Sequence, residues 1–255
     1  MSSLATSIGA EAALEDRHVL IVCGGKGVRL RPYTTVIPKP LVPIGDRYSI
    51  LEIVMLQLAA CGFKRATLAI GHLGHLIRAY VGDGSQWGLE VDYAEEESPL
   101  GTIGPALMIK DRLPEHFLLM NGDVLTDLDY ADLLDTHIKS GAPLTVATNE
   151  RVYQVDFGVL NVGANRQITS FTEKPPLSYT VSMGVYAISK SQLERYTPGL
   201  PYGFDEIMLD LIKRENYPAS YEFSGFWLDI GRPEDYDRAN EEFAILAPRL
   251  LPGVR

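Results

Sequence analysis

The chain has 255 residues, of which 46% are hydrophobic, and this is enough to bury a full core. Its formal net charge of −10 argues against nucleic acid or an anionic membrane as the main partner. It has two isolated cysteines and no run of about 18 apolar residues, so we expect a cytoplasmic protein with reduced thiols and no membrane span.

The first 16 residues lack a basic start followed by an apolar core, and we interpret them as a flexible N-terminal tail. No long linker, low-complexity run or internal repeat interrupts the chain after them. We therefore expect a single domain over 17–255. Its first half, 17–150, alternates strand-like and helix-like segments, whereas its second half, 151–255, has a more mixed pattern.

The first half of the chain is predicted to form βαβ units. In chain order, strands are expected at 18–23, 65–70, 89–93, 117–121 and 143–148, with helices at 49–61, 73–81, 102–111 and 130–139. Ser49 with Glu52 forms a capping box, and Gly62 supplies the left-handed stop of the same helix. This alternation predicts a mainly parallel sheet that is covered on both faces.

The second half is predicted to contain strands joined by short turns, followed by helices. Strands are expected at 157–162, 167–173 and 181–188, and helices at 190–196, 204–214 and 233–246. The last helix begins with Pro233, Glu234 and Asp235, which suit a helix N-terminus.

A glycine-rich basic loop follows the first predicted strand. Gly24, Gly25 and Gly27 allow backbone N–H groups to approach a ligand, and Arg29 and Lys39 add positive charge. Between residues 26 and 47 there are five basic residues and one acid. On charge alone, a solvated basic loop is the alternative.

The loop is neither of the two common nucleotide motifs. No G-x-x-x-x-G-K-[ST] sequence is present, and Leu30 stands where a dinucleotide fingerprint has its third glycine. The basic loop therefore favours a nucleoside triphosphate as the ligand. The alternative, a nicotinamide-dependent oxidoreductase, is disfavoured by the missing third glycine and by the basic loop.

Two aspartates are candidates for a functional role. Asp123 follows an apolar strand and Gly122, at the edge of an α/β sheet where ligands bind. Its alternative role is a helix cap, for which Asp129 is better placed. Asp229 lies in an apolar setting, where a bare carboxylate is costly unless a metal or tight hydrogen bonds compensate. His72 and His75 lack further ligands at metal-site spacing, and Glu95, Glu96 and Glu97 are interpreted as solvated, with the end of this run bordering the base pocket.

Five motifs in order resemble the signature of the sugar-1-phosphate nucleotidyltransferases, the nucleotide-sugar pyrophosphorylases. They are 24–32 with 38–43, 97–102, 121–123, 171–175 and 227–231. The Pro-Leu-Gly-Thr sequence at 99–102 is most similar to the mannose-1-phosphate and heptose-1-phosphate guanylyltransferase branch. Val28 and Cys23 depart from the family, which usually has Thr and Ala at these positions.

The resemblance implies an α/β, GT-A-like nucleotidyltransferase fold, with a Rossmann-like doubly wound, mainly parallel mixed sheet in one domain. It implies that an NTP, GTP by the branch, and a sugar-1-phosphate give an NDP-sugar and pyrophosphate with Mg²⁺. The alternatives are a non-catalytic nucleotide-sugar-binding regulator and a transferase for another base or a cyclitol phosphate. The sequence does not fix the sugar, and a homo-oligomer is compatible with the family.

The resemblance also implies a role for each motif residue. Catalysis falls to Arg29, Lys39, Asp123, Lys174 and Asp229, with Mg²⁺ held by Asp123 and Asp229. Lys26 and Arg31 either contact phosphate or lie in solvent. The nucleotide would be bound by Gly24, Gly25, Lys26, Gly27, Pro99, Gly101 and Thr102. The sugar phosphate would be bound by Gly158, Glu173, Lys174 and Gly184, although Gly184 alone could equally mark a bulge.

Overall fold

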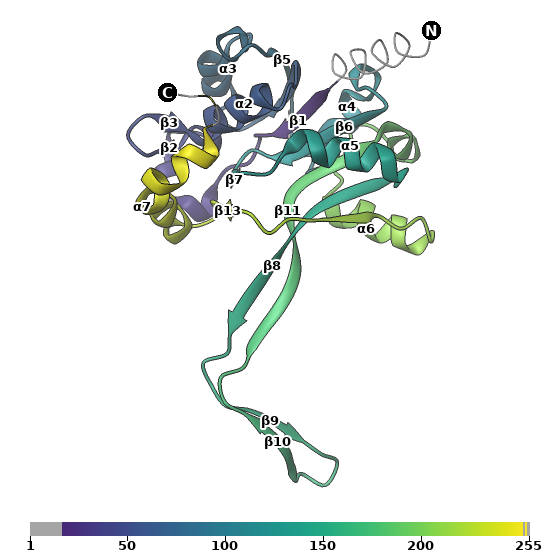
Figure 1. Cartoon of the computed structure of the whole chain (residues 1–255). Coiled ribbons are helices and arrows are strands. Elements are labelled where there is room, and N and C mark those ends of the chain that lie inside the picture. Colours follow the sequence, from purple (N-terminus) through teal and green to yellow (C-terminus); the bar gives the residue numbers. More distant parts are fainter. Residues whose placement is uncertain (1–16, 252, 254–255) are drawn as a thin grey trace, which may run out of the picture.

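A seven-stranded sheet forms the centre of the computed structural model, which describes residues 17–251 and 253 (Figure 1). The predicted tail at 1–16 lies outside the described residues. The strand order is β12-β8-β11-β6-β1-β4-β5. The strands in that order are β12 Ala219–Glu222, β8 Leu144–Gln154, β11 Pro176–Ser189, β6 His116–Asn121, β1 His18–Val22, β4 Arg65–Ile70 and β5 Glu90–Glu95.

The sheet is mixed but mainly parallel, as predicted. β1 runs parallel to β4 and β6, β4 to β5, and β12 to β8, whereas β11 is antiparallel to both β6 and β8. Three short two-stranded pairs lie outside this sheet. They are β2 Pro43–Ile44 with β3 Tyr48–Ser49, β7 Val124–Thr126 with β13 Trp227–Asp229, and β9 Val159–Val162 with β10 Ile168–Thr172.

Helices cover both faces of the sheet. The covering helices are α2 Ile50–Ala60, α3 Gly74–Val81, α4 Gly104–Met108, α5 Tyr130–Ser140 and α6 Phe204–Lys213. The last helix, α7 Pro233–Leu250, packs in a third core cluster with residues of β2, β7 and β13. Successive residues of β1 point to opposite faces, so Val19 and Ile21 pack in one core cluster and Leu20 packs in another. The first cluster includes residues of α2, α3 and α5, and the second includes residues of α4 and α6. This arrangement explains why the inner strands are continuous apolar runs.

The predicted ends of α2 are observed, with one difference. Ser49 Oγ accepts a hydrogen bond from the Glu52 backbone N–H at 3.1 Å, and Gly62 has the left-handed φ of 80°. The Glu52 carboxylate instead accepts a hydrogen bond from the Tyr80 hydroxyl at 2.7 Å. The helix start is thus fixed by half of the expected capping box.

Two predicted helices are corrected. The segment predicted as a helix over 102–111 has a helix only over Gly104–Met108, followed by a 3₁₀ turn over Lys110–Arg112. Its start is delayed because Gly101 has a positive φ and Pro105 stands in the first turn. The segment 190–196 is a 3₁₀ helix over Lys190–Arg195, with Leu193 as its buried residue.

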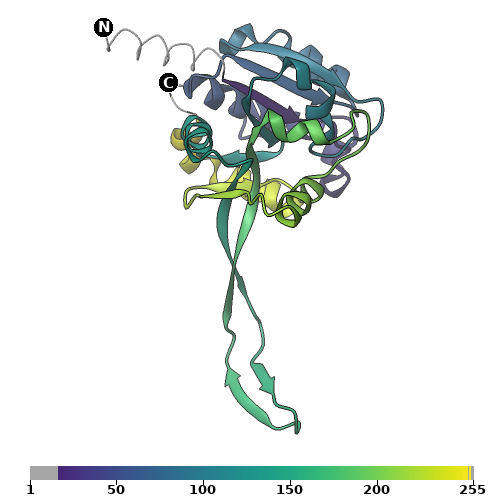
Figure 2. The ribbon, with the colours of Figure 1, turned by 90° about the vertical axis from the view of Figure 1, so that its right-hand side faces the viewer.

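A long hairpin projects from the body of the molecule. β8 and β11 continue beyond the sheet, and β9 and β10 form the tip of the hairpin (Figures 1 and 2). We call residues 150–181 the arm. The strands expected at 157–162 and 167–173 overlap β9 and β10, and the strand expected at 181–188 is the inner part of β11. None of the helices in the described residues is both long and apolar enough to cross a membrane.

Two buried histidines predict that stability depends on pH. Burial lowers the pKa of His18 and of His137 to about 4, whereas an unfolded histidine titrates near 6.5. Between these pH values the unfolded chain therefore binds more protons than the folded chain does. The free energy of unfolding has its largest value above pH 6.5 and falls as the pH drops toward 4. Each histidine contributes on the order of 3 kcal/mol to this loss.

Replacing His137 tests this dependence. His137→Gln should remove about half of the loss, because His18 still titrates. Urea unfolding at pH 7 and pH 4.5 gives the two free energies for each protein. His75→Gln, at an exposed position on α3, is the matched control and should keep the wild-type pH dependence. An unchanged loss in His137→Gln would contradict the prediction.

Candidate active site

The glycine-rich loop after β1 is folded into an open cradle. Gly27 has a positive φ of 58°, and the Thr34 hydroxyl donates a hydrogen bond to its carbonyl oxygen at 2.7 Å. A Cβ at Gly27 would lie 3.0 Å from the Thr34 side chain. The loop is therefore closed on itself, with Gly25 and Arg29 exposed at its rim.

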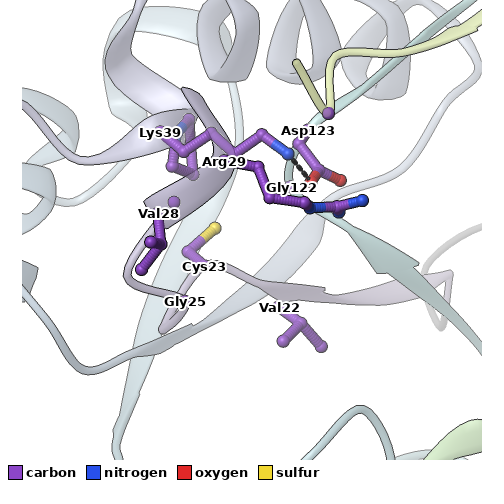
Figure 3. Close-up of a pocket in the computed structure, with 11 residues that line it drawn as sticks. Val22, Cys23, Gly25, Val28, Arg29, Lys39, Gly122 and Asp123 are labelled. Atoms are coloured by element: carbon purple, nitrogen blue, oxygen red, sulfur yellow. Dashed lines mark hydrogen bonds and ion pairs between the residues drawn. The ribbon is translucent and has the colours of Figure 1, made fainter. Parts of the chain in front are cut away.

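A cavity of about 280 Å³ lies between this loop and the carboxyl ends of β1 and β6. We call it the Asp123 cavity. Its lining includes Arg29, Lys39 and Asp123, which Figure 3 draws around a common space. Lys39 is almost fully buried, and its ammonium group forms an ion pair with Asp123. Pro38 and Pro40 flank Lys39 and restrict its backbone.

Gly122 packs the floor of this cavity. A Cβ at Gly122 would lie 2.8 Å from Cys23 Sγ and 3.0 Å from the Val22 carbonyl oxygen. The Gly122 N–H donates a hydrogen bond to the same carbonyl at 3.0 Å. The close contact between the ends of β1 and β6 therefore needs glycine at 122, and it sets the position of Asp123.

Asp229 lies next to Asp123. β13 pairs with β7 so that Asp229 is opposite Val124, and the Ile230 N–H donates a hydrogen bond to the Asp123 carbonyl oxygen at 3.1 Å. Burial raises the pKa of Asp229, and the negative charge of Asp123 adds to this rise. The positive charges of Lys39 and Arg29 oppose it. Two carboxylates thus share one corner with two cations.

The donor set of this corner suits a divalent cation. Asp123 Oδ1 is buried and has no hydrogen-bond partner within the described part of the chain. A second carboxylate beside it would be neutralised by the same ion. Among residues 17–251 and 253, no group of three or more His, Cys, Asp and Glu side chains could hold a metal. A cation here would therefore take its other ligands from water or from a bound phosphate.

A second cavity, of about 610 Å³, adjoins the first and shares Val22 and Gly25 with it. We call it the Glu96 cavity. Gly24, Lys26, Pro99 and Gly101 also line it. The Tyr202 backbone holds the 99–102 turn in place, because its N–H donates to the Leu100 carbonyl oxygen at 2.9 Å and its carbonyl accepts from the Ile103 N–H at 3.0 Å.

Glu96 is a site residue that the sequence analysis missed. Glu95 and Glu97 are exposed as expected, but Glu96 is partly buried in this cavity, and burial raises its pKa. Its Oε1 accepts a hydrogen bond from the Leu100 N–H at 3.0 Å, and its Oε2 would collide with a Cβ at Gly24. The signal was its place directly after β5, at the same sheet edge as Gly24 and Asp123.

The predicted site residues fall into two groups. Residues expected to bind nucleotide or metal line the two cavities or lie directly beside them; Asp229 belongs to this group. Thr102 lies in the turn at the Glu96 cavity, and Arg31 is exposed. Gly184 lies in a bulge of β11 with φ 77°, where a Cβ would be 2.8 Å from Asn121 Nδ2, so it also belongs to the body.

The remaining three residues lie on the arm, outside both cavities. Gly158 and Glu173 are neighbours at its tip, because a Cβ at Gly158 would lie 3.2 Å from Glu173 Oε2 and would collide with Phe171. Lys174 is exposed and has φ 42°. Its carbonyl oxygen accepts a hydrogen bond from the Gln154 side chain across the hairpin. The structure therefore does not bring Gly158, Glu173 and Lys174 to the Asp123 cavity of the same chain.

A model of the nucleotidyl transferase family matches residues 18–244. The chain belongs to this family. It is 31% identical to a mannose-1-phosphate guanyltransferase of Schizosaccharomyces pombe, over 85% of this chain and 61% of the relative. It is 30% identical to the catalytic subunit beta of a mannose-1-phosphate guanylyltransferase of Dictyostelium discoideum, over 85% and 62%. The chain thus spans about three fifths of the length of these relatives.

Solved structures agree with this assignment. HddC from Yersinia pseudotuberculosis matches with a TM-score of 0.69 and 27% identity, over 89% of this chain and 99% of that one, and HddC has also been solved in complex with GMP-PN. A putative glucose-1-phosphate thymidylyltransferase from Bacillus anthracis matches with a TM-score of 0.71 and 24% identity, over 88% and 94%, which supports the fold. The predicted family and fold are confirmed.

The turn at 99–102 predicts that alanine at Gly101 costs more stability than alanine at Gly25. Gly101 has φ 76°, and a Cβ there would lie 2.5 Å from the Tyr202 carbonyl oxygen. Gly101→Ala should therefore lower the free energy of unfolding by about 1–3 kcal/mol. Gly25→Ala is the control, because a Cβ at Gly25 meets nothing within 4 Å, and its change should stay within about 0.5 kcal/mol. Urea unfolding measures both, and equal effects would contradict the prediction.

Proposed function

We propose that this chain transfers a nucleotidyl group from an NTP, namely GTP, to a sugar-1-phosphate of the mannose or heptose type. An oxygen of the sugar phosphate attacks the α-phosphorus of the nucleotide, the bond from that phosphorus to the β-phosphate bridging oxygen breaks, and pyrophosphate leaves. The observation that carries the proposal is the meeting of Asp123, Asp229, Lys39 and Arg29 at one corner beside an open glycine-rich loop.

The residues of this corner suit the reaction because its nucleophile is already ionised. A phosphate oxygen needs no general base, so the protein must bring two polyanions together and neutralise developing charge. The loop would present its N–H groups to the triphosphate, and Arg29 would bind it through its forked donors. Lys39 would move from Asp123 to the departing pyrophosphate.

Mg²⁺ is the proposed metal, held by Asp123 and Asp229. When bound, it would supply charge neutralisation at the phosphate under attack. The buried Oδ1 of Asp123 has no hydrogen-bond partner among residues 17–251 and 253, and the pKa of Asp229 is raised. Both observations support this assignment, because a cation would pair with the first oxygen and favour the ionised form of the second carboxyl. The Asp123 carboxylate already pairs with one positive charge in this structure, the Lys39 ammonium group.

Glu96 supports guanine as the base. Guanine carries two adjacent donors on its pairing edge, N1–H and the N2 amino group, and an ionised carboxylate accepts both. Adenine and cytosine place an acceptor beside their amino group, and thymine and uracil flank one N–H with two carbonyls, so each would put an acceptor against the carboxylate. The names of the relatives, which are guanylyltransferases, and the GMP-PN complex of HddC agree with this assignment.

The activity is tested by measuring pyrophosphate release with Mg²⁺, crossing GTP, ATP, CTP, UTP and dTTP with mannose-, glucose- and heptose-1-phosphate. We expect release with GTP and one sugar phosphate. Asp123→Asn should lower turnover by about 100-fold or more, because the corner loses a metal ligand and a charge. Asp129→Asn is the matched control: Asp129 caps α5, and asparagine caps equally well. Full turnover in Asp123→Asn would overturn the magnesium assignment, and no release from any pair would overturn the activity.

The base assignment has its own test. Glu96→Gln replaces one acceptor with a donor, so kcat/KM for GTP should fall about 10- to 100-fold, which corresponds to losing a two-bond base contact. The loss for ATP or dTTP should be much smaller. Glu97→Gln changes the neighbouring exposed carboxylate and should leave the preference unchanged. An equal loss for all nucleotides would show that Glu96 does not read the base.

A further inference from the structure

The arm exposes an unusual amount of apolar surface. Ten large apolar or aromatic side chains between residues 152 and 179 are exposed, among them Phe157, Val162, Ile168 and Phe171. Phe157 is 79% exposed. A two-stranded ribbon has too little core to be stable alone, and exposed apolar side chains in such number on one hairpin favour a contact with another molecule. The body of the same chain leaves these apolar side chains exposed, so we expect another molecule to bury them.

The arm also holds part of the proposed active site away from the rest. Glu173 and Lys174, assigned above to the sugar phosphate, lie near its tip, and no residue from 151 to 179 lines either cavity. Figures 1 and 2, which differ by 90°, both show the tip well away from the body. The corner at Asp123 thus has the residues assigned to the nucleotide in place and lacks Glu173 and Lys174.

The shaft of the arm is continuous with the central sheet. β8 and β11 pair residue by residue from Ser182 opposite Thr148 to Pro176 opposite Gln154, and the register shifts only between Ser182 and Tyr186. This hydrogen-bonded ladder keeps the two strands of the shaft extended as far as Gln154 and Pro176. The shaft therefore directs the tip outward.

These observations select the partner. Glu173 and Lys174 could bind the sugar phosphate only beside a bound nucleotide, at a site that its own Glu173 and Lys174 do not reach. A second copy of this chain has such a site, and its arm carries the same residues in return. Reciprocal exchange closes with two-fold symmetry, which is the commonest symmetry of protein dimers.

We propose that two copies of this chain exchange arms, so that Glu173 and Lys174 of each copy complete the sugar-phosphate side of the other copy's active site. The body of the second copy covers the apolar side chains of the arm. The identity of the ligand rests on the proposed function, whereas the exchange itself rests on the arm.

Complementation between two defective chains tests the exchange. Lys174→Ala removes a proposed sugar-phosphate ligand from the arm and leaves the body unchanged. Asp123→Asn removes a proposed metal ligand from the body and leaves the arm unchanged. Each variant alone should lose about 100-fold or more of its turnover. The two chains are co-expressed with different affinity tags, and the mixed dimer is isolated through both tags. It should regain about half of the wild-type turnover, because one of its two sites combines an intact body with an intact arm.

The matched control is a mixed dimer of Arg29→Ala and Asp123→Asn, in which both defects lie in the body. It contains no intact site and should remain inactive. If the arms served their own bodies, the Lys174→Ala and Asp123→Asn dimer would be equally inactive, and this result would overturn the proposal. Failure to capture any mixed dimer, or full turnover of Lys174→Ala alone, would also overturn it.

A second measurement does not depend on the activity. Light scattering after size exclusion should show a wild-type dimer at micromolar concentration and a monomer once 155–175 is replaced by a two-residue Asn-Gly turn. Phe157→Ser combined with Val162→Ser should weaken the dimer without shortening the arm, and Asn165→Ser, in the turn of the tip, should not. If the wild type released no pyrophosphate, the proposed function would fail while this measurement still decided the exchange. A monomeric wild type would overturn the exchange.

Discussion

The rest of the site depends on the enforced proximity of two carboxylates, Asp123 and Asp229. Like charges at one corner repel, and burial raises the cost of keeping them ionised. The backbone nevertheless fixes this arrangement, because β7 and β13 pair next to both residues. The Lys39 ammonium group offsets part of the repulsion. In the proposed function, a cation held at this corner would neutralise the phosphates of a triphosphate bound at the glycine-rich loop.

The sheet explains why the two cavities adjoin. Parallel strands present their carboxyl ends at one edge, so β1 supplies the glycine loop, β5 leads to Glu96 and β6 leads to Asp123. The antiparallel β11 enters beside β6 and brings Gly184 against Asn121. The same strand then leaves the body as half of the arm. One strand therefore connects the floor of the site to the segment that we assign to the neighbouring copy.

Much of the body could be predicted because its signals are local. The apolar runs of β1, β4 and β6, the Ser49 cap and the Gly62 stop each depend on a few neighbouring residues. Other features depend on contacts between distant segments. The edge strand β12 has the mixed sequence Ala-Ser-Tyr-Glu and becomes a strand only by pairing with β8, and Glu96 is buried by loops from elsewhere. The position of the arm could not be predicted either, because a motif such as Glu173–Lys174 records which residues are present and not whether their hairpin folds back or reaches outward.

The packing beneath Gly122 bears on how the protein would respond to oxidants. Cys23 fills the space under that glycine and is 2% exposed. Burial raises the pKa of its thiol, and the charges of Asp123 and Glu96 raise it further. Oxidants and alkylating reagents attack the thiolate, which this setting disfavours. We therefore expect the Cys23 thiol to react slowly, and the same acidic groups that would attract a cation to this corner also disfavour the reactive thiolate beneath it.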